Sequence, residues 1–484
     1  MKKIIEIIKK KWLRDTFLTI LLIAIIFAIY FGANYGIKKL NLSDIDLTTD
    51  KIYSISESTK TKISGIDEKV TIQLINLSNY LYLVDFSNKY TQANDNIVVE
   101  EISDLASRAD LMNKYSLTSS DSLIVIKTDE REETLTLYDL YTYDYTTYEE
   151  IDLTEEAITN AIVGVTIEEK PNIYFLEGHN YYTEQYFTTI KNAIKSEANN
   201  VNTLNILVKG QIPEDCDCLV ITTLKEDITD LERDKIIEYI NKGGKILLLT
   251  DPNIMGATLT NYKKVLDVYG ITVSDAILLE QDETKMMAGF PEFILSEISA
   301  GTPITQNINM NMNICVIDAG RIEFKDDETL SNLGVTYKTI ATTSDSAFLR
   351  SDLQITSLNK TNKDTDAGNS IIGALATKTL ENGEKAELII FSNALFATDQ
   401  QIPLDQNYYY YTYAVTTANN EDVVLNSVAY LTERTDTITI RKNHDSVNYT
   451  VTESQNRIIL IIIFAVPVLI IVAGIVIWQI RKRK

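Results

Sequence analysis

The longest apolar stretches of the chain, residues 16–37 and 458–480, lie near its two ends, and neither contains a charged residue. An apolar helix needs roughly 20 residues to cross a hydrocarbon core of about 30 Å. A buried helix of a globular domain usually keeps a polar stripe and rarely stays free of charge over such a length. We therefore predict one transmembrane helix at 16–37 and another at 457–480. A cleavable signal peptide is the alternative for the first, although no Ala-x-Ala-like site closes it.

Basic residues flank both apolar stretches on the side of the nearer chain end. Lys and Arg on short segments resist translocation and mark the cytoplasmic side of a membrane. The tails 1–15 and 481–484 are therefore predicted to be cytoplasmic, with a large ectodomain outside the plasma membrane. The basic residues are Lys2, Lys3, Lys9, Lys10, Lys11 and Arg14 in the first tail, and Arg481, Lys482, Arg483 and Lys484 in the second.

Between the predicted helices, short β-rich runs alternate with helical patterns, which is typical of α/β domains. A polar stalk over 38–65 is expected to lead into a small domain at 66–150. Its pattern predicts strands at 70–75, 97–102, 122–128 and 133–138, with a helix at 80–93. This order suggests a thioredoxin-like layer. It lacks a Cys-x-x-Cys motif, so redox chemistry is not expected there.

A tyrosine-rich tract, Tyr138 to Tyr148, closes the small domain. The tract is interpreted as a polar linker or an edge hairpin, in preference to an aromatic platform for a ligand.

The pattern at 151–431 predicts a second, larger domain with a Rossmann-like or flavodoxin-like open sheet. The run Lys245 to Thr250 is apolar, as expected of a parallel strand covered on both faces. A capping box, Thr229 with Glu232, starts the helix before it, and Gly243 and Gly244 end that helix. Further strands are predicted at 172–176, 217–222 and 386–391, further helices at 155–167, 183–198 and 421–431, and a second stalk at 432–456.

The chain has a formal net charge of −23, and each basic tail contributes +4, so the residues between the tails carry −31. Such a surface repels phosphate backbones, which argues against nucleic acid as a partner. Cysteine is scarce, with only Cys216, Cys218 and Cys315. Their spacing fits neither a redox motif nor a zinc motif.

The order of segments resembles a known family, the auxiliary ABC-transporter component of the gliding-motility type (GldG-like). The resemblance covers nearly the whole chain and depends on the conjunction of segments, because no single motif is diagnostic. Family members often carry Gly-Asp where Phe391 and Ser392 stand, and Gly where Asn180 stands. The segments that carry the resemblance are 46–56, 153–162, 171–179, 231–252, 389–397 and 424–431.

The resemblance implies a non-enzymatic accessory that works with an ABC permease and its cytoplasmic ATP-binding subunit. The chain itself has no Gly-x-x-x-x-Gly-Lys-Ser/Thr phosphate loop, and two membrane helices do not make a transporter. The predicted helices would pack in the lipid bilayer through small residues: Gly32 and Gly36 on the first, and Ala473 and Gly474 on the second. Lipid-facing filler is the alternative for these residues, and homo-oligomerisation is left open.

The candidates for ligand-binding turns follow predicted strands: Glu177, Gly178, His179, Asp251 and Asn393. For the turn at 177–179 and for Asp251, a purely structural turn is the preferred interpretation. Open α/β sheets gather ligands at such strand ends. A hydrolase would also need a Gly-x-Ser-x-Gly turn or its Cys equivalent, which the sequence lacks. With only two histidines, His179 and His444, a multi-histidine metal site is excluded, and no cofactor is predicted. A membrane-anchored hydrolase-like enzyme and a wall-binding or signalling scaffold remain the alternative functions.

Overall fold

The structure is a computed structural model, and it describes residues 54–144, 149–254, 256–305, 308, 313–405 and 409–434, together with Phe27 and Phe31. Residues Ile55–Ser446 form one compact unit. Both predicted transmembrane helices lie outside the described residues, apart from Phe27 and Phe31, as do their small-residue faces at Gly32, Gly36, Ala473 and Gly474. Within the described ranges, each helix is too short or too polar to span a bilayer.

The first part of the compact unit is a small four-stranded sheet in the order β2-β1-β3-β4. Strand β1 (Val70–Ile75) pairs in parallel with β2 (Ile97–Ile102) and antiparallel with β3 (Leu123–Lys127). Strand β4 (Glu132–Leu135) pairs antiparallel with β3 at the edge.

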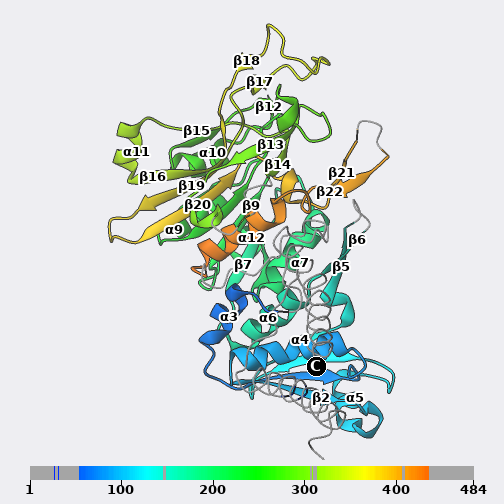
Figure 1. Cartoon of the computed structure of the whole chain (residues 1–484). Helices are drawn as coiled ribbons and strands as arrows, with labels where there is room; N and C mark the ends of the chain where they lie inside the picture. Colours follow the sequence, from blue (N-terminus) through cyan, green and yellow to red (C-terminus); the bar gives the residue numbers. More distant parts are fainter. Residues whose placement is uncertain are drawn as a thin grey trace, which may run out of the picture. The chain divides into compact units, whose positions relative to one another are not determined.

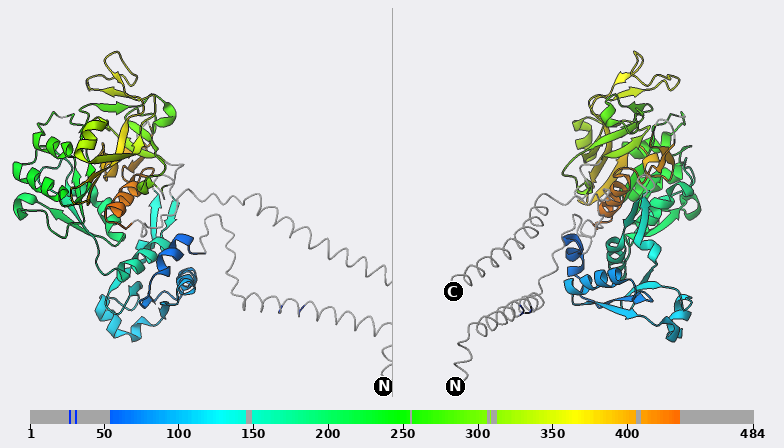
Figure 2. Two further views of the ribbon diagram at one scale, coloured as in Figure 1. Left: turned by 90° about the vertical axis from the view of Figure 1, so that its left-hand side faces the viewer. Right: turned by 45° about the vertical axis from the view of Figure 1, so that its right-hand side comes forward.

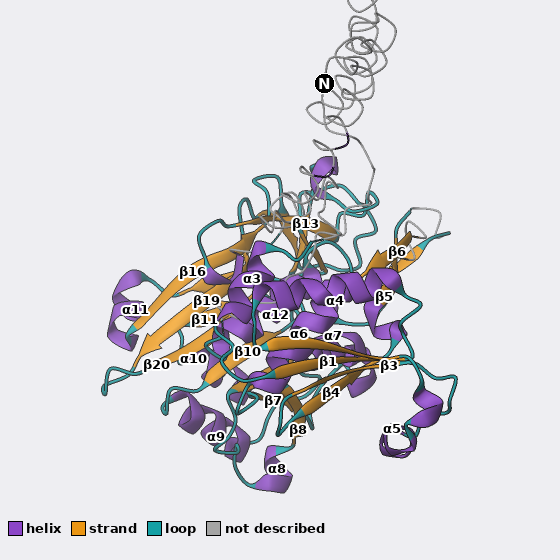
Figure 3. Cartoon of the chain, turned by 60° about the horizontal axis from the view of Figure 1, so that its bottom comes forward, coloured by secondary structure: helices purple, strands orange, loops and turns teal. Residues whose placement is uncertain are grey.

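Helices cover the small sheet because its central strands, β1 and β3, are apolar on both faces (Figure 3). On one face pack α3 (Glu57–Ser64), α4 (Leu81–Ala93) and α6 (Thr154–Thr166). Helix α5 (Ala109–Tyr115) contributes to the smaller core that includes Ile75 and Val125. Helix α6 follows the predicted domain boundary at 150/151, yet it packs against the small sheet.

The tyrosine-rich tract contributes to a hairpin, as one of its two interpretations predicted. Strand β5 (Tyr141–Asp144) pairs antiparallel with β6 (Glu149–Asp152). The 3₁₀ turn η2 (Leu137–Leu140) precedes the hairpin, and η1 (Leu105–Ser107) precedes α5.

The larger part of the unit is built on an eleven-stranded sheet, one half of which is parallel (Figure 1). These parallel strands run in the order β8-β7-β9-β10-β20. If these five strands are numbered by their order along the chain, they lie in the sheet in the order 2-1-3-4-5. The strand order therefore reverses its direction between β7 and β9. The strands are β7 (Asn172–Leu176), β8 (Asn200–Leu204), β9 (Cys218–Thr222), β10 (Lys245–Leu249) and β20 (Lys385–Phe391).

Helices cover both faces of the parallel half, which explains why its central strands are continuously apolar (Figures 1 and 2). One face packs against α7 (Thr188–Ser196) and α12 (Asn420–Leu431). The other packs against α8 (Ile206–Lys209), α9 (Asp230–Ile240) and α10 (Thr260–Asp267). The predicted capping box of α9 is present, with Thr229 and Glu232 bonding each other's amides.

The other half of the sheet is antiparallel and was not predicted. Beyond β20 the order continues β19-β16-β13-β14, and β15 joins β11 to β19. The strands are β11 (Ile271–Val273), β13 (Phe293–Ile298), β14 (Ile314–Ile317), β15 (Ile322–Phe324), β16 (Val335–Thr342) and β19 (Ile371–Thr379). Outside this sheet lie β12 (Ile277–Leu279), β17 (Phe348–Arg350), β18 (Thr365–Asp366), β21 (Gln401–Pro403), β22 (Tyr411–Tyr413), α11 (Asp327–Leu333), η3 (Glu184–Phe187), η4 (Glu283–Lys285), η5 (Pro303–Thr305) and η6 (Leu395–Ala397).

The mixed α/β class predicted from the sequence is confirmed. The assignments to a Rossmann-like or flavodoxin-like type and to a thioredoxin-like type stay predictions.

Candidate functional site

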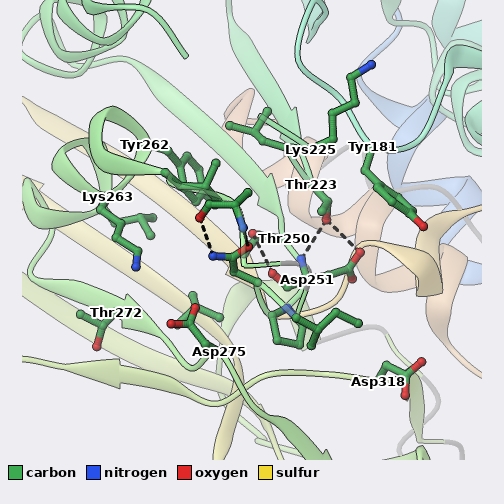
Figure 4. A pocket seen from close by; sticks show the side chains of 18 of the residues that line it. Tyr181, Thr223, Lys225, Thr250, Asp251, Tyr262, Lys263, Thr272, Asp275 and Asp318 are labelled. Carbon is green, nitrogen blue, oxygen red and sulfur yellow. Dashed lines mark hydrogen bonds between the residues drawn. The ribbon is translucent and has the colours of Figure 1, made fainter. Parts of the chain in front are cut away.

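A cavity of about 700 Å³ opens where the parallel strands of the large sheet end (Figure 4). Ligand pockets that hold small molecules typically have volumes of about 300–1,000 Å³. Open α/β sheets place such pockets outside the carboxyl ends of their strands. The lining residues come chiefly from the segments after β7, β9, β10 and β14, and from α10 and β11.

Polar side chains meet at this edge because each strand is followed at once by a polar turn. Thr223 follows β9, Asp251 follows β10 shortly, Asp318 follows β14, and Asn393 follows β20. The segment after β14 is tied to the end of β20, since the Gly320 amide donates to the Ser392 carbonyl at 2.9 Å and the Ser392 hydroxyl donates to the Gly320 carbonyl at 2.6 Å. An antiparallel strand of the sheet thus contributes a carboxylate beside the parallel strands.

Asp251 is held in one orientation by donors from two neighbouring turns. Its Oδ1 accepts from Asn393 Nδ2 at 3.0 Å and from the Ala394 amide at 2.6 Å. Its Oδ2 accepts from the Thr223 hydroxyl at 2.9 Å, and its own amide donates back to that hydroxyl at 2.8 Å. Burial nevertheless raises the pKa of Asp251, against the opposing effect of these bonds.

Asn393 is a structural bridge and does not itself line the cavity. Its side chain is 1% exposed. Besides Asp251, its Nδ2 donates to the Ile317 carbonyl at 2.6 Å, while its Oδ1 accepts from the amides of Ile317 and Phe396, both at 3.1 Å. One amide therefore joins the ends of β10, β14 and β20.

Asp318 lines the cavity and accepts no side-chain hydrogen bond from any residue in the described part of the chain. Its backbone is left-handed, with φ of 56°, which is uncommon for a residue other than glycine. Burial, together with the negative charges of Glu292 and Asp251, raises the pKa of Asp318 to about 6. Two carboxylates therefore lie near one another at this end of the cavity without a cation between them in the described ranges.

Aromatic side chains line the two ends of the cavity. Tyr181 and Tyr182 contact each other edge to face, with ring centroids 5.0 Å apart. Burial, together with the negative charge of nearby Asp251, raises the pKa of the Tyr182 hydroxyl. Tyr262, from α10, is 7% exposed, and its hydroxyl is buried without a hydrogen-bond partner of acceptable geometry among the described residues. Burial raises the pKa of Tyr262, and the nearby Thr250 hydroxyl lowers it only in part.

Two lysines lie at the cavity but are not buried in it. Lys225 and Lys263 are exposed, and neither forms an ion pair within the described ranges. Figure 4 shows the Lys225 side chain extending away from Asp251. The remaining lining is mostly apolar and includes Leu224, Leu259, Leu266, Ile271 and Val273.

The predicted turn Glu177, Gly178, His179 is close in sequence to the cavity but is not part of its lining. Gly178 has φ of 125°, a conformation that favours glycine. His179 Nε2 contacts Glu232 Oε2 at 3.0 Å, and Glu232 is fully buried because it closes the capping box of α9. His179 is therefore engaged by a helix start, as a structural residue would be.

The described residues that line the cavity include no His and no Cys, so they form no nucleophile–histidine pair. No group of His, Cys, Asp and Glu within the described ranges is arranged to hold a metal ion. All three cysteines are buried, and burial raises the pKa of the Cys216 and Cys315 thiols to about 12.

Sequence reasoning found Asp251 and its partner Asn393 but missed Asp318, Thr223 and the tyrosines. Thr223 had a detectable signal, since it follows an apolar strand in the same way as Asp251. Asp318 had a weaker signal, because β14 is short and its position beside Asp251 depends on hydrogen bonds between the segments that end β14 and β20, which are far apart in the chain.

Comparison with known proteins gives a family but no close relative. No curated protein matches the chain. One solved structure, described as "mmIFT52 N-terminal domain", matches 54% of this chain and 97% of that chain, with 13% sequence identity and a TM-score of 0.38.

The family described as "ABC-type uncharacterized transport system" matches residues 170–427, which is more than half of the chain and includes the whole cavity. The chain therefore belongs to this family and is an auxiliary component of an ABC-type transport system.

Proposed function

We propose that the chain is a non-enzymatic, extracytoplasmic subunit that assembles with an ABC permease and a cytoplasmic ATP-binding subunit, in the manner of the gliding-motility auxiliary component. The observation that carries the proposal is the family match over 170–427. A phosphate loop is missing from the sequence, so ATP hydrolysis has to come from another chain.

The placement outside the cytoplasm is part of the proposal and is supported by the sequence. Residues 16–37 and 458–480 are free of charge and long enough to span a bilayer, and basic tails flank both. On this basis the cavity domain would lie on the outer face of the plasma membrane, between two anchors. The strand orders of the two sheets support the finer assignment to flavodoxin-like and thioredoxin-like types.

The non-enzymatic part of the proposal is supported by the chemistry of the site. Asp251 is bonded by Thr223, Asn393 and Ala394, which fixes it as a charge or an acceptor. The described lining offers no histidine to activate a hydroxyl. His179 is occupied by Glu232.

The partner proposal is tested by affinity purification of the full chain, tagged at one end and extracted in mild detergent. We expect a multi-span permease and an ATP-binding protein at stoichiometric amounts by mass spectrometry. Cells that express the untagged chain provide the background. If the chain is recovered alone, or only with soluble proteins, the proposal is wrong.

The topology is tested with an engineered cysteine, because the native thiols are buried and react poorly. Val208 is 80% exposed, so a Val208→Cys variant presents a reactive thiol on the surface of the large domain. A membrane-impermeant maleimide should label this variant in intact cells, whereas a Lys484→Cys variant should be labelled only after lysis. Labelling in the opposite order would contradict the proposed orientation.

A further inference from the structure

We propose that the cavity at the carboxyl edge of the large sheet binds an organic amine with an apolar body. The ammonium group would lie at the end formed by Asp251 and Asp318, and the body would lie along the apolar wall near α10. This inference does not depend on the membrane placement or on the transport partners.

The acidic end of the cavity carries uncompensated negative charge. Asp318 lies close enough to Asp251 and Glu292 for their charges to raise its pKa. None of these three carboxylates forms an ion pair with a described Lys or Arg. A cation bound here would relieve the repulsion, so the site favours positively charged ligands.

Aromatic rings adjoin the carboxylates at the same end. Tyr181 is half exposed and stands against Tyr182, with the two rings nearly perpendicular at 83°. Tyrosine faces attract an ammonium group within about 6 Å of the ring centre. Carboxylates beside tyrosines thus distinguish an organic cation from a neutral ligand of the same shape.

The apolar wall gives the ligand its second feature. Leu259 and Leu266 of the α10 region, and Ile271 and Val273 of β11, line the cavity together with Leu224. A bare metal ion or a small hydrophilic cation would leave this apolar surface exposed to water. Its size and composition fit a hydrocarbon or aromatic body.

An anionic ligand is disfavoured in spite of the two lysines. Lys225 and Lys263 are exposed at the cavity, and the Lys225 side chain extends away from Asp251 (Figure 4). Their charges are therefore screened by water, while Asp251 and Asp318 are both partly buried. An anion in the cavity would face the two carboxylates directly.

The test compares three probes of similar shape: 2-phenylethylammonium, 2-phenylethanol and 3-phenylpropionate. Binding to the full chain in detergent is measured by isothermal titration calorimetry, with a blank titration into micelles. We expect the ammonium probe to bind at least tenfold more tightly than the alcohol, and the carboxylate probe to bind most weakly. Equal affinities for the three probes, or no binding of the ammonium probe, would overturn the proposal.

Variants locate the site. Asp318→Asn is nearly isosteric and should weaken binding of the ammonium probe about tenfold while leaving the alcohol unchanged. Asp345→Asn is the matched control, because Asp345 is an exposed carboxylate that does not line the cavity. If Asp318→Asn binds the ammonium probe as the control does, the proposal is wrong.

A second variant covers the case in which Asp318→Asn alters the fold. Tyr181 is half exposed, so Tyr181→Leu leaves the core untouched. This variant should weaken the binding of the ammonium probe several-fold more than the binding of the alcohol. An equal effect on both probes would also count against the proposed cation site.

Discussion

Replacing Asn393 with alanine should destabilise the large domain strongly, although the residue lies in a turn. The side chain makes four hydrogen bonds, to Asp251, to both backbone groups of Ile317 and to the Phe396 amide. Ile317 and Phe396 are buried, so their backbone groups would lose their partners without access to bulk water.

The magnitude follows from the number of lost bonds. A typical intramolecular hydrogen bond contributes about 1 kcal/mol net, and a buried group left unpaired costs about 1–3 kcal/mol. Four bonds therefore predict a loss of about 4 kcal/mol, which falls to about 2 kcal/mol if water from the adjacent cavity replaces the amide. At about 2 °C for each kcal/mol, the midpoint of thermal unfolding should fall by about 4–8 °C.

The assay is thermal unfolding of the full chain in detergent, followed by circular dichroism. Asn382→Ala is the matched control, because Asn382 is an exposed turn residue whose bonds are confined to Glu384. The variant Asn393→Asp tests the role of the amide separately. It can still accept the two hydrogen bonds from the Ile317 and Phe396 amides, but it places a second carboxyl group against Asp251. Its destabilisation should increase as the pH rises from about 4 to 7, because the new carboxyl ionises in that range. If Asn393→Ala melts within 1 °C of the control, the bridging role that we assign to this residue is wrong.

Two further predictions concern charge. The Arg350 side chain is 5% exposed and forms two hydrogen bonds to the carboxylate of Asp364, which is 1% exposed. Arg350→Ala should lower the free energy of unfolding, measured with denaturant, by about 3 kcal/mol, because it leaves a buried carboxylate without its cation. An effect no larger than that of breaking the exposed pair Arg108–Asp110 would contradict this prediction. The pKa of Asp318 is raised to about 6 in the folded state, against about 3.9 in the unfolded state, so the folded state binds the proton more tightly and the free energy of unfolding should fall as the pH rises from about 4 to 6. Asp318→Asn should remove this fall and be about 1–2 kcal/mol more stable than the parent at pH 7, as measured by unfolding across this pH range. An unchanged pH profile in the variant would refute the prediction.

The central parallel strands and the capped helix between them were predictable because their signals are local. Strand β10 is a continuous apolar run, and the turn before it needs two glycines. Gly243 has φ of 84°, and a Cβ on Gly244 would lie 2.4 Å from the Tyr239 ring. Such constraints act over a few residues and can be read from the sequence.

The antiparallel half of the sheet escaped prediction because its strands lack these signals. Strand β16 has exposed residues through much of its first half, so its pattern looks like a polar loop. In the parallel half, strand β8, Asn200–Leu204, escaped prediction for the same reason, since it is buried only at Leu204. Both strands are stabilised by pairing with neighbours that are distant in sequence, which no local pattern reveals.

The candidate site divides in the same way. Asp251 was predicted because it directly follows an apolar strand, and the structure places it at the cavity. The role of Asn393 as a bridge, and the presence of Asp318, depend on the long-range contact between β14 and β20. The predicted resemblance to an auxiliary ABC-transporter component is confirmed at the level of the family, while the gliding-motility type stays a prediction.

Membership of a transport complex is tested most directly by ATP hydrolysis in material purified through a tag on this chain. The chain has no phosphate loop, so activity in such material reports a bound ATP-binding subunit. We predict ATP hydrolysis that elutes with the tagged chain on size exclusion and is absent when the chain carries no tag. A pure, folded chain that elutes without any ATP hydrolysis, from cells that express the proposed permease and ATP-binding subunit, would contradict the account.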